Sequence, residues 1–249
     1  FAEAQYGMFI HFGLYSQLGG QYQGKKGIRY AEWIQAEMNI PTAEYAELIH
    51  GFNPTEFDAG FIARTAKEAG MTYLVITAKH HEGFCLWDSD YTDFDVANSP
   101  FRGRDILAEL KAACEEQGIR FGLYYSIIDW NHPGQKPDME GREKRFRWKH
   151  TLLAEDEEHD YLAYQTNQVL ELIEKYDPAV LWFDGDWADW WTLKDGITLY
   201  NTILEASPDI IVNNRVAKRH LFERDYVTQE QGHFDETFPK HWEGCYTMN

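Results

Sequence analysis

The sequence predicts an α/β protein of the (β/α)8-barrel type, and three observations predict it. Short apolar runs, typical of buried parallel strands, alternate with amphipathic helical segments. The chain has 249 residues, 44% of them apolar, which is a usual length for one such barrel. Reactive polar side chains follow strand after strand, as they do at the catalytic mouth of a barrel. We therefore expect one catalytic domain over residues 1–249.

The expected strands are seven apolar runs, one fewer than a closed barrel needs. Each run is short and is bounded by turn signals or by a helical segment. In order along the chain, they are Gly7-Ile10, Tyr73-Thr77, Phe121-Tyr125, Val180-Phe183, Ile210-Val212, Tyr226-Thr228 and Tyr246-Met248.

Four helices are expected between these strands. One face of Arg104-Gln117 is apolar at helical spacing, and Gly118 stands where a C-cap belongs. Asp58 is a candidate N-cap for another helix, and prolines follow two more. These three helices are expected at Ala59-Ala69, at Tyr161-Tyr176 before Pro178, and at Lys194-Ala206 before Pro208.

One polar segment, Asp129-Asp160, is long for a barrel loop. It contains two prolines and runs from a basic patch into an acidic one. Two interpretations stay open: the segment walls a substrate subsite, or it is a solvated insertion with a charge-patterned surface. The basic patch comprises Arg142, Lys144, Arg145, Arg147 and Lys149, and the acidic patch comprises Asp156, Glu157, Glu158 and Asp160.

Composition excludes several classes of partner and site. Acidic residues outnumber basic ones by 41 to 23, and the formal charge of -18 repels polyphosphates and anionic lipids. Nucleic acid and membrane are therefore not expected partners, and no apolar run approaches the roughly 18 residues that span a bilayer. The three cysteines are an odd number without CxxC spacing, which argues against a disulfide framework and a structural zinc site.

The polar residues at the strand ends are the candidate site. In a barrel the reacting groups come from the C-terminal ends of several strands and meet at one mouth. Each residue alone is weak evidence for catalysis, and their convergence is the argument. Six successive strand ends supply His11, His80 with His81, Tyr125, Asp184, Arg215 and Glu230.

Two of these groups, Asp184 and Glu230, are carboxyl groups that follow nearby strands. A glycosidase needs such a pair, one carboxylate to attack the anomeric carbon or activate water and one carboxylic acid to protonate the leaving oxygen. Arg215 and the histidines are expected to keep Asp184 ionised. The pair therefore meets this requirement of a glycosidase site.

Seven segments resemble, in order, the signature segments of the family 29 α-L-fucosidases. The resemblance extends from Tyr6 to Asn249, and the combination is more specific than any single segment. The segments read YGMFIHFG, AEWI at Ala31-Ile34, KHHEGF, GLYYS, LWFDG, VNNR and WEGCYTMN.

The resemblance implies a retaining exo-glycosidase that hydrolyses terminal α-L-fucose from a fucosylated glycan, in two steps through a covalent fucosyl-enzyme. It implies Asp184 as the nucleophile, no cofactor and no metal. Fucose would be bound by His11, Glu32, Trp33, His80, His81, Tyr125 and Arg215, with Trp182 lining the pocket. Imidazole, carboxylate and guanidinium groups satisfy sugar hydroxyls, and aromatic faces take the apolar edge of a 6-deoxy sugar.

The general acid/base is assigned to Glu230 in TQEQ. Glu243 in WEGC is the main rival and otherwise a substrate-binding candidate, with Glu236 and Asp235 behind it. A different interpretation of Glu243 is a structural hydrogen bond beneath the site.

Departures from the family pattern leave other readings open. The family would continue beyond Asn249 through an eighth strand, and commonly through a C-terminal β-sandwich, so a barrel truncated before its last strand is expected. One alternative is a barrel that binds fucose without turnover. Another is a metal-dependent hydrolase with His11, His80, His81 and Asp184 as ligands. Family analogy also suggests a periplasmic or extracellular location, and no oligomeric state is predicted.

Overall fold

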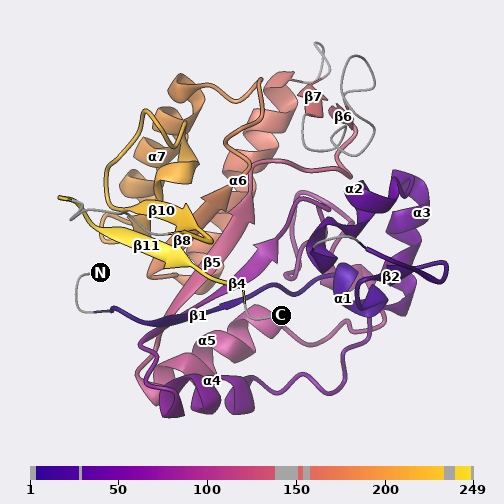
Figure 1. Cartoon of the computed structure of the whole chain (residues 1–249), viewed down its shortest axis with the longest axis horizontal. Helices are drawn as coiled ribbons and strands as arrows, with labels where there is room; N and C mark the ends of the chain where they lie inside the picture. Colours follow the sequence, from indigo (N-terminus) through magenta and orange to yellow (C-terminus); the bar gives the residue numbers. More distant parts are fainter. Residues whose placement is uncertain (1–3, 28–29, 138–150, 154–157, 233–238, 248–249) are drawn as a thin grey trace.

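A parallel five-stranded sheet lies at the centre of the computed structural model, which describes residues 4–27, 30–137, 151–153, 158–232 and 239–247 (Figure 1). Every neighbouring pair of these strands is parallel, which requires crossover connections. The strand order is β1 (Gly7–Ile10), β4 (Tyr73–Lys79), β5 (Arg120–Ser126), β8 (Val180–Asp184) and β9 (Ile211–Val212). The α/β class with a parallel sheet is therefore confirmed.

The four predicted helices are confirmed as the crossovers between strands. The Asp58 carboxylate accepts a hydrogen bond of 2.8 Å from the backbone N–H of Phe61, and so caps the first of them. Gly118 ends another in the left-handed conformation at φ +66°. The helices are α4 (Ala59–Glu68), α5 (Ile106–Gln117), α6 (Glu158–Tyr176) and α7 (Leu193–Ala206).

Two further parallel strands, β10 (Val227–Glu230) and β11 (Trp242–Cys245), continue the row. A parallel bridge between Asn213 and Tyr226 joins the end of β9 to this pair. The Tyr73 hydroxyl of β4 donates a 2.6 Å hydrogen bond to Glu243 of β11, so the row of strands curls until distant members meet. Within the described residues this row does not close into an eight-stranded ring.

The predicted last strand, Tyr246-Met248, is wrong because the strand lies earlier, at Trp242–Cys245. Its sequence WEGC contains a glycine and a carboxylate, so it does not read as an apolar run. The carboxylate is tolerated because Glu243 accepts hydrogen bonds inside the curled sheet, at 2.6 Å from Tyr73 and 2.7 Å from Trp182.

Short elements between β1 and α4 have no counterpart in the predicted pattern. They are α1 (Tyr15–Leu18), the hairpin of β2 (Gln21–Tyr22) and β3 (Lys25–Lys26), η1 (Ala31–Trp33), α2 (Ile34–Met38), α3 (Thr42–Ala46) and η2 (Glu47–Gly51). None is long enough to show a helical or strand period clearly. They lie beyond the C-terminal end of β1, at the right of Figure 1, and η1 carries the first three residues of AEWI.

The long insertion contains one antiparallel pair, β6 (Gln135–Pro137) and β7 (Thr151–Leu153). The predicted basic patch at 142–149 lies outside the described residues, as do Asp156 and Glu157. Glu158 and Asp160 fall within the first turn of α6. One more short element, η3 (Val96–Asn98), lies between β4 and α5.

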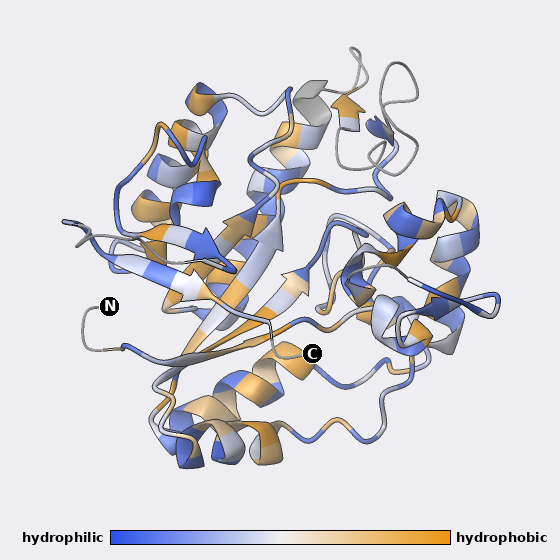
Figure 2. Cartoon of the chain, in the orientation of Figure 1, coloured by the Kyte–Doolittle hydropathy of each residue, from blue (hydrophilic) through white to orange (hydrophobic). Residues whose placement is uncertain are grey.

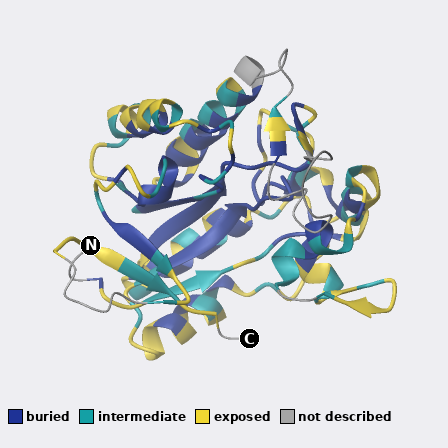
Figure 3. Cartoon of the chain, turned by 45° about the horizontal axis from the view of Figure 1, so that its top comes forward, coloured by how far each residue is buried: buried dark blue, intermediate teal, exposed yellow. Residues whose placement is uncertain are grey.

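The middle strands of the central sheet, β4, β5 and β8, are largely buried (Figure 3), and the strands are largely apolar (Figure 2). Because side chains alternate along a strand, consecutive residues enter different cores. Leu123 and Leu181 pack in the large core with the helices. Tyr124 and Trp182 belong to a second cluster on the other face, with Val75 and Tyr226. Only this second face and the strand ends are available to a site inside the curled sheet.

None of the helices in the described ranges combines the length and apolar composition that crossing a bilayer requires.

Candidate active site

Asp184 is the last residue of β8, and four side chains contact its carboxylate. Arg215 Nη1 donates to Oδ1 at 2.7 Å and Arg219 Nη2 donates to the same oxygen at 3.3 Å. On the other oxygen, Oδ2, the contacts are longer: 3.4 Å from the Tyr124 hydroxyl and 3.7 Å from His81 Nε2. Burial by itself raises the pKa of Asp184, but Arg215, with His81 and Arg219, outweighs it and holds the pKa below its usual value.

His80 and His81 reach one pocket, although adjacent residues of a strand point to opposite faces. They do so because β4 ends at Lys79, directly before them. The two imidazole rings lie 4.3 Å apart, and His80 stacks on Tyr124 at 5.2 Å. Burial depresses the pKa of both, to about 4 for His81, so both rings are neutral at pH 7.

The hydrogen bonds of Ser126 fix the tautomer of His81. The Ser126 hydroxyl donates its only hydrogen to the carbonyl of Ile128 at 2.5 Å. The 2.6 Å contact between His81 Nδ1 and Ser126 Oγ must therefore use a hydrogen on Nδ1. His81 Nε2 is then a bare acceptor, buried and without a hydrogen-bond partner, 3.7 Å from Asp184. A ligand hydroxyl is the kind of donor that satisfies it.

Three tryptophan rings lie close to the His81 ring. Trp33 of η1 meets the His81 ring edge to face at 5.1 Å, and Trp130 and Trp187 lie 5.5 and 5.4 Å from the same ring. Such a wall matches the apolar edge of a sugar ring. Beside it, burial and the nearby Glu230 carboxylate raise the pKa of Glu32. Trp33 and Glu32 thus reach the site from η1, which is not part of the central sheet.

His11 follows β1 and is exposed to solvent at this mouth. Its ring lies 4.7 Å from Phe9, 5.5 Å from His80 and 5.8 Å from Tyr124. The structure therefore brings His11 together with the predicted histidines of β4.

Arg215, in η5 (Asn214–Val216), connects the two candidate catalytic carboxyl groups. Its Nη1 contacts Asp184, and its Nη2 lies 3.2 Å from Oε2 of Glu230, at the end of β10. Arg215 is 1% exposed, whereas the Glu230 side chain is 58% exposed. The guanidinium lies 4.7 Å above the Trp182 ring, so Trp182 forms a layer beneath the site. Glu230 is thus open to a ligand and Asp184 is not freely solvated.

Glu243 does not face the site with a free carboxylate. Tyr73 and Trp182 donate to its two oxygens at 2.6 and 2.7 Å. It pairs in register with Thr228, one layer below Glu230, which pairs with Cys245. Each oxygen of Glu243 thus accepts a hydrogen bond from a neighbouring side chain beneath the site, and a substrate-binding role for Glu243 stays a prediction. Asp235 and Glu236, the other rivals for acid/base, lie outside the described residues.

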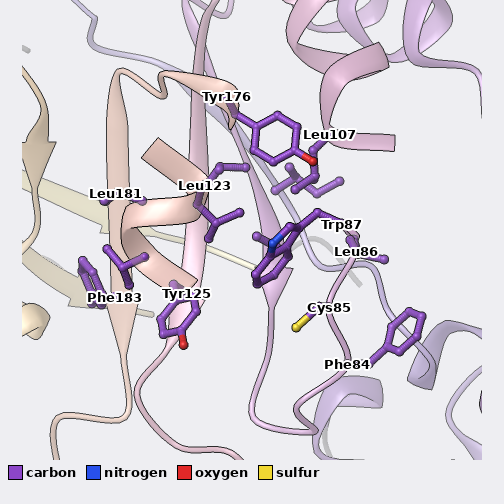
Figure 4. Packing of buried hydrophobic residues seen from close by; sticks show 14 of the residues in the cluster. Phe84, Cys85, Leu86, Trp87, Leu107, Leu123, Tyr125, Tyr176, Leu181 and Phe183 are labelled. Carbon is purple, nitrogen blue, oxygen red and sulfur yellow. The ribbon is translucent and has the colours of Figure 1, made fainter. Parts of the chain in front are cut away.

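Tyr125 faces the large core, and the tyrosine beside Asp184 and His80 is Tyr124. The Tyr125 ring packs with Leu123, Leu181 and Phe183 in the core between sheet and helices (Figure 4). Its hydroxyl accepts from Lys79 Nζ at 2.9 Å and donates to Gln168 at 2.8 Å. A shift of one residue along a strand moves a side chain to the other face.

Four residues of the site were missed by the sequence analysis. Tyr124 differs from the predicted Tyr125 by one position, and Arg219 lies after η5 in an irregular segment. Trp130 and Trp187 follow β5 and β8 within a few residues, so position after a strand was a usable signal for them. Within the described ranges, no three His, Cys, Asp or Glu side chains are arranged to hold a metal ion.

The sequence matches one family of known proteins. The family model described as Alpha-L-fucosidase matches residues 1–249. A putative α-L-fucosidase of Caenorhabditis elegans is 28% identical over 266 residues, covering 99% of this chain and 51% of its own length. The plasma α-L-fucosidase of Homo sapiens is 29% identical over 272 residues, covering 100% of this chain and 53% of its own length. The chain therefore spans about half the length of these relatives.

Solved structures share the fold. An α-L-fucosidase of Bacteroides thetaiotaomicron, trapped as a covalent intermediate with 2-fluoro-fucosyl fluoride, matches at a TM-score of 0.83 and 32% identity, over 98% of this chain and 57% of that one. An α-L-fucosidase of Lactobacillus casei in complex with α-L-fucose matches at a TM-score of 0.78 and 35% identity, over 91% of this chain and 72% of that one.

Proposed function

The chain belongs to the α-L-fucosidase family, and on this premise we propose that it carries the catalytic site of a retaining exo-α-L-fucosidase acting on fucosylated glycans. The observation that carries the proposal is the state of Asp184. Its carboxylate is kept ionised by guanidinium groups at Oδ1, while Oδ2 has only long contacts. A nucleophilic carboxylate needs both properties, a negative charge and an oxygen free to attack.

In the first step Oδ2 of Asp184 attacks the anomeric carbon of fucose. The bond between that carbon and the glycosidic oxygen breaks, and Glu230 donates its proton to the departing oxygen. The products are a fucosyl ester of Asp184 and the released alcohol of the glycan. Arg215 supports this pairing because one planar guanidinium contacts both carboxyl groups, which favours the spacing of about 5–5.5 Å found in retaining enzymes.

In the second step a water molecule attacks the same carbon. Glu230, now ionised, takes a proton from the water, and the ester bond to Oδ2 breaks to release fucose and restore the Asp184 carboxylate. Two inversions give net retention of the anomeric configuration. The donors at Oδ1 stabilise the carboxylate charge as it returns.

The pocket supports recognition of a small sugar. His80 and His81 present unpartnered ring nitrogens, His11 lies beside His80, and Glu32 lies near Glu230. Trp33, Trp130 and Trp187 supply apolar surface. Relatives in complex with α-L-fucose, or trapped with 2-fluoro-fucosyl fluoride, point to fucose as that sugar.

We further propose that the scaffold is a (β/α)8-type barrel that forms one catalytic domain. Three observations support it: the parallel order of the central strands, the bridge that leads to β10 and β11, and the contact between Tyr73 and Glu243 that curls the row. Family analogy supports a periplasmic or extracellular setting.

The proposal is tested with an aryl α-L-fucoside and proton NMR of the first-formed sugar. We expect hydrolysis that releases the α-anomer of fucose before mutarotation, with the rate unchanged by a chelator. Initial release of the β-anomer would contradict the retaining mechanism, and loss of activity in the chelator would favour a metal-dependent hydrolase. Fucose binding without turnover would identify a sugar-binding pocket.

Two adjacent tyrosines give a matched pair of variants. Tyr124→Phe removes a hydroxyl 3.4 Å from Asp184, and kcat/KM is expected to fall about tenfold with little change in Tm. Tyr125→Phe removes one hydrogen-bond partner from buried Lys79 and one from Gln168 Oε1, which costs about 1–3 kcal/mol of unfolding free energy while kcat/KM of the folded protein stays near the original value. Kinetics and thermal unfolding of both variants check this; the reverse pattern would return Tyr125 to the site.

A further inference from the structure

We propose that Arg219, held in place by Asp186, is a positioning residue for the nucleophile: it fixes Oδ1 of Asp184 and keeps the carboxylate ionised. The inference rests on the proposed function, because it gives Arg219 a role in that reaction. The inference is based on a second guanidinium at this carboxylate. Arg219 Nη2 lies 3.3 Å from Oδ1 of Asp184, the oxygen that Arg215 also contacts. Arg219 lies 35 residues from Asp184 in sequence, so this contact depends on the fold.

Asp186 holds Arg219 through three donors. The backbone N–H of Arg219 donates to Oδ2 at 3.1 Å, and its Nε donates to Oδ2 and Oδ1 at 2.8 and 2.9 Å. Nη2 of Arg219 bonds Oδ1 of Asp186 as well as Oδ1 of Asp184. The bidentate pairing of a planar guanidinium with a carboxylate sets its orientation, not only its position. Asp186 is 3% exposed, so this pair is largely shielded from solvent.

The backbone around the pair is fixed from both sides. Lys218 Nζ donates to the carbonyl oxygens of Asp186 and Ala188, at 2.7 and 2.8 Å. Between the two aspartates, Gly185 has φ +97°, and a Cβ there would lie 3.0 Å from the backbone nitrogen of Ile128. Only glycine fits this turn, which carries the chain from Asp184 to Asp186. The segments 184–188 and 218–219 therefore form one clasp.

The two arginines contact different pairs of carboxyl groups. Arg215 is buried and shared between Asp184 and Glu230, whereas Arg219 is 21% exposed and shared between Asp184 and Asp186. Three carboxyl groups and two guanidiniums thus alternate, with Asp184 in the middle. Asp184 is the only one of the three with both guanidiniums on it, within the residues that the structure describes. Loss of Arg219 leaves its Oδ1 to Arg215 alone.

The sign of the effect follows from the groups that face Asp184. Guanidiniums lower the pKa of a carboxyl group, and nearby carboxylates raise it. Without Arg219, the pKa of Asp184 rises, so a higher pH is needed to ionise the nucleophile. The facing groups are Arg215 of η5, Arg219 after it, His81 after β4, Tyr124 of β5, Glu230 of β10, Asp186 after β8, and His11 after β1.

The experiment compares pH profiles of kcat/KM for wild type, Arg219→Gln, Arg219→Lys and Asp186→Asn. The acid limb of this profile reports ionisation of the free enzyme. In Arg219→Gln we expect that limb to move up by about 0.5–1 pH unit, with kcat/KM at the optimum about tenfold lower. Arg219→Lys, which keeps the cation, returns the limb toward wild type. Asp186→Asn loosens the clasp, but it also removes a carboxylate that raises the pKa of Asp184. We therefore expect the acid limb of this variant not to move to higher pH.

An unshifted acid limb in folded Arg219→Gln would overturn the inference, whatever happens to kcat. An equal upward shift in Asp186→Asn would also overturn it, because the pH of the acid limb would then depend on the conformation of segment 184–188 and not on the charge of the guanidinium. Thermal unfolding verifies that each variant is folded, and Arg219→Met replaces the glutamine variant if that one is not. The proposed function fails separately, by absence of α-L-fucosidase activity in the wild type.

Discussion

Replacing Asp184 with alanine is expected to lower kcat for an aryl α-L-fucoside by at least about 10⁴-fold, with Tm nearly unchanged. The effect is expected to be large because, in the proposed mechanism, this carboxylate forms the covalent bond in the first step. Of the neighbouring carboxylates that the structure describes, Asp186 is engaged by Arg219, and Glu230 lies beyond Arg215. The cavity left by the small side chain admits azide. We expect azide to restore turnover and to give β-fucosyl azide, since one displacement inverts the anomeric carbon.

A matched control for this variant is Asp225→Ala. Asp225 lies just before β10 and accepts hydrogen bonds of 2.8 Å from Tyr200 and from the backbone N–H of Val212, but it does not contact the site. We expect lower stability and nearly unchanged kcat. If Asp184→Ala instead keeps more than about one-hundredth of the wild-type kcat, Asp184 is not the nucleophile.

Replacing Glu230 with alanine is expected to lower kcat/KM about 10²- to 10⁴-fold for fucosides with poor leaving groups, and much less for aryl fucosides that need no protonation. The exposed position of Glu230 beside Arg215 suits a group that exchanges protons with the glycan and then with water. Because the fucosyl ester on Asp184 still forms, azide intercepts it from the other face. The product is therefore expected to be α-fucosyl azide, opposite to that of Asp184→Ala.

Glu243→Gln is the control that separates the two glutamates. Its carboxylate accepts from Tyr73 and Trp182, so the amide disturbs a buried contact. We expect a lower Tm and no dependence of the loss of activity on the leaving group. Should Glu243→Gln instead show that dependence while Glu230→Ala does not, the acid/base assignment is wrong.

The helices and the central strands could be predicted because each is marked by a pattern within its own stretch of sequence. Parallel strands buried on both faces read as continuous apolar runs, and α4 and α5 carry caps at Asp58 and Gly118. The rule that reactive groups follow barrel strands then found Asp184 and Glu230, which the structure connects through Arg215.

The remaining features depend on information that the sequence does not carry locally. A run that is apolar on both faces does not reveal which face a residue takes, and so Tyr125 was chosen where Tyr124 lies in the pocket. Arg219 comes from an irregular segment, and Asp186 orients it across a distance in sequence. Glu243 is a candidate because of the segment WEGC, and its two partners could not be predicted because Tyr73 and Trp182 come from strands that meet Glu243 only when the sheet curls.

The most direct test of the central claim is to trap the fucosyl-enzyme. The protein is incubated with 2-fluoro-fucosyl fluoride, in which fluorine slows the second step more than the first, and is then digested and analysed by mass spectrometry. The account predicts one fluorofucosyl adduct, on the peptide that contains Asp184, and none in Asp184→Ala. An adduct on another carboxylate, or hydrolysis of α-L-fucosides with no adduct under conditions of full inactivation, would contradict Asp184 as the nucleophile.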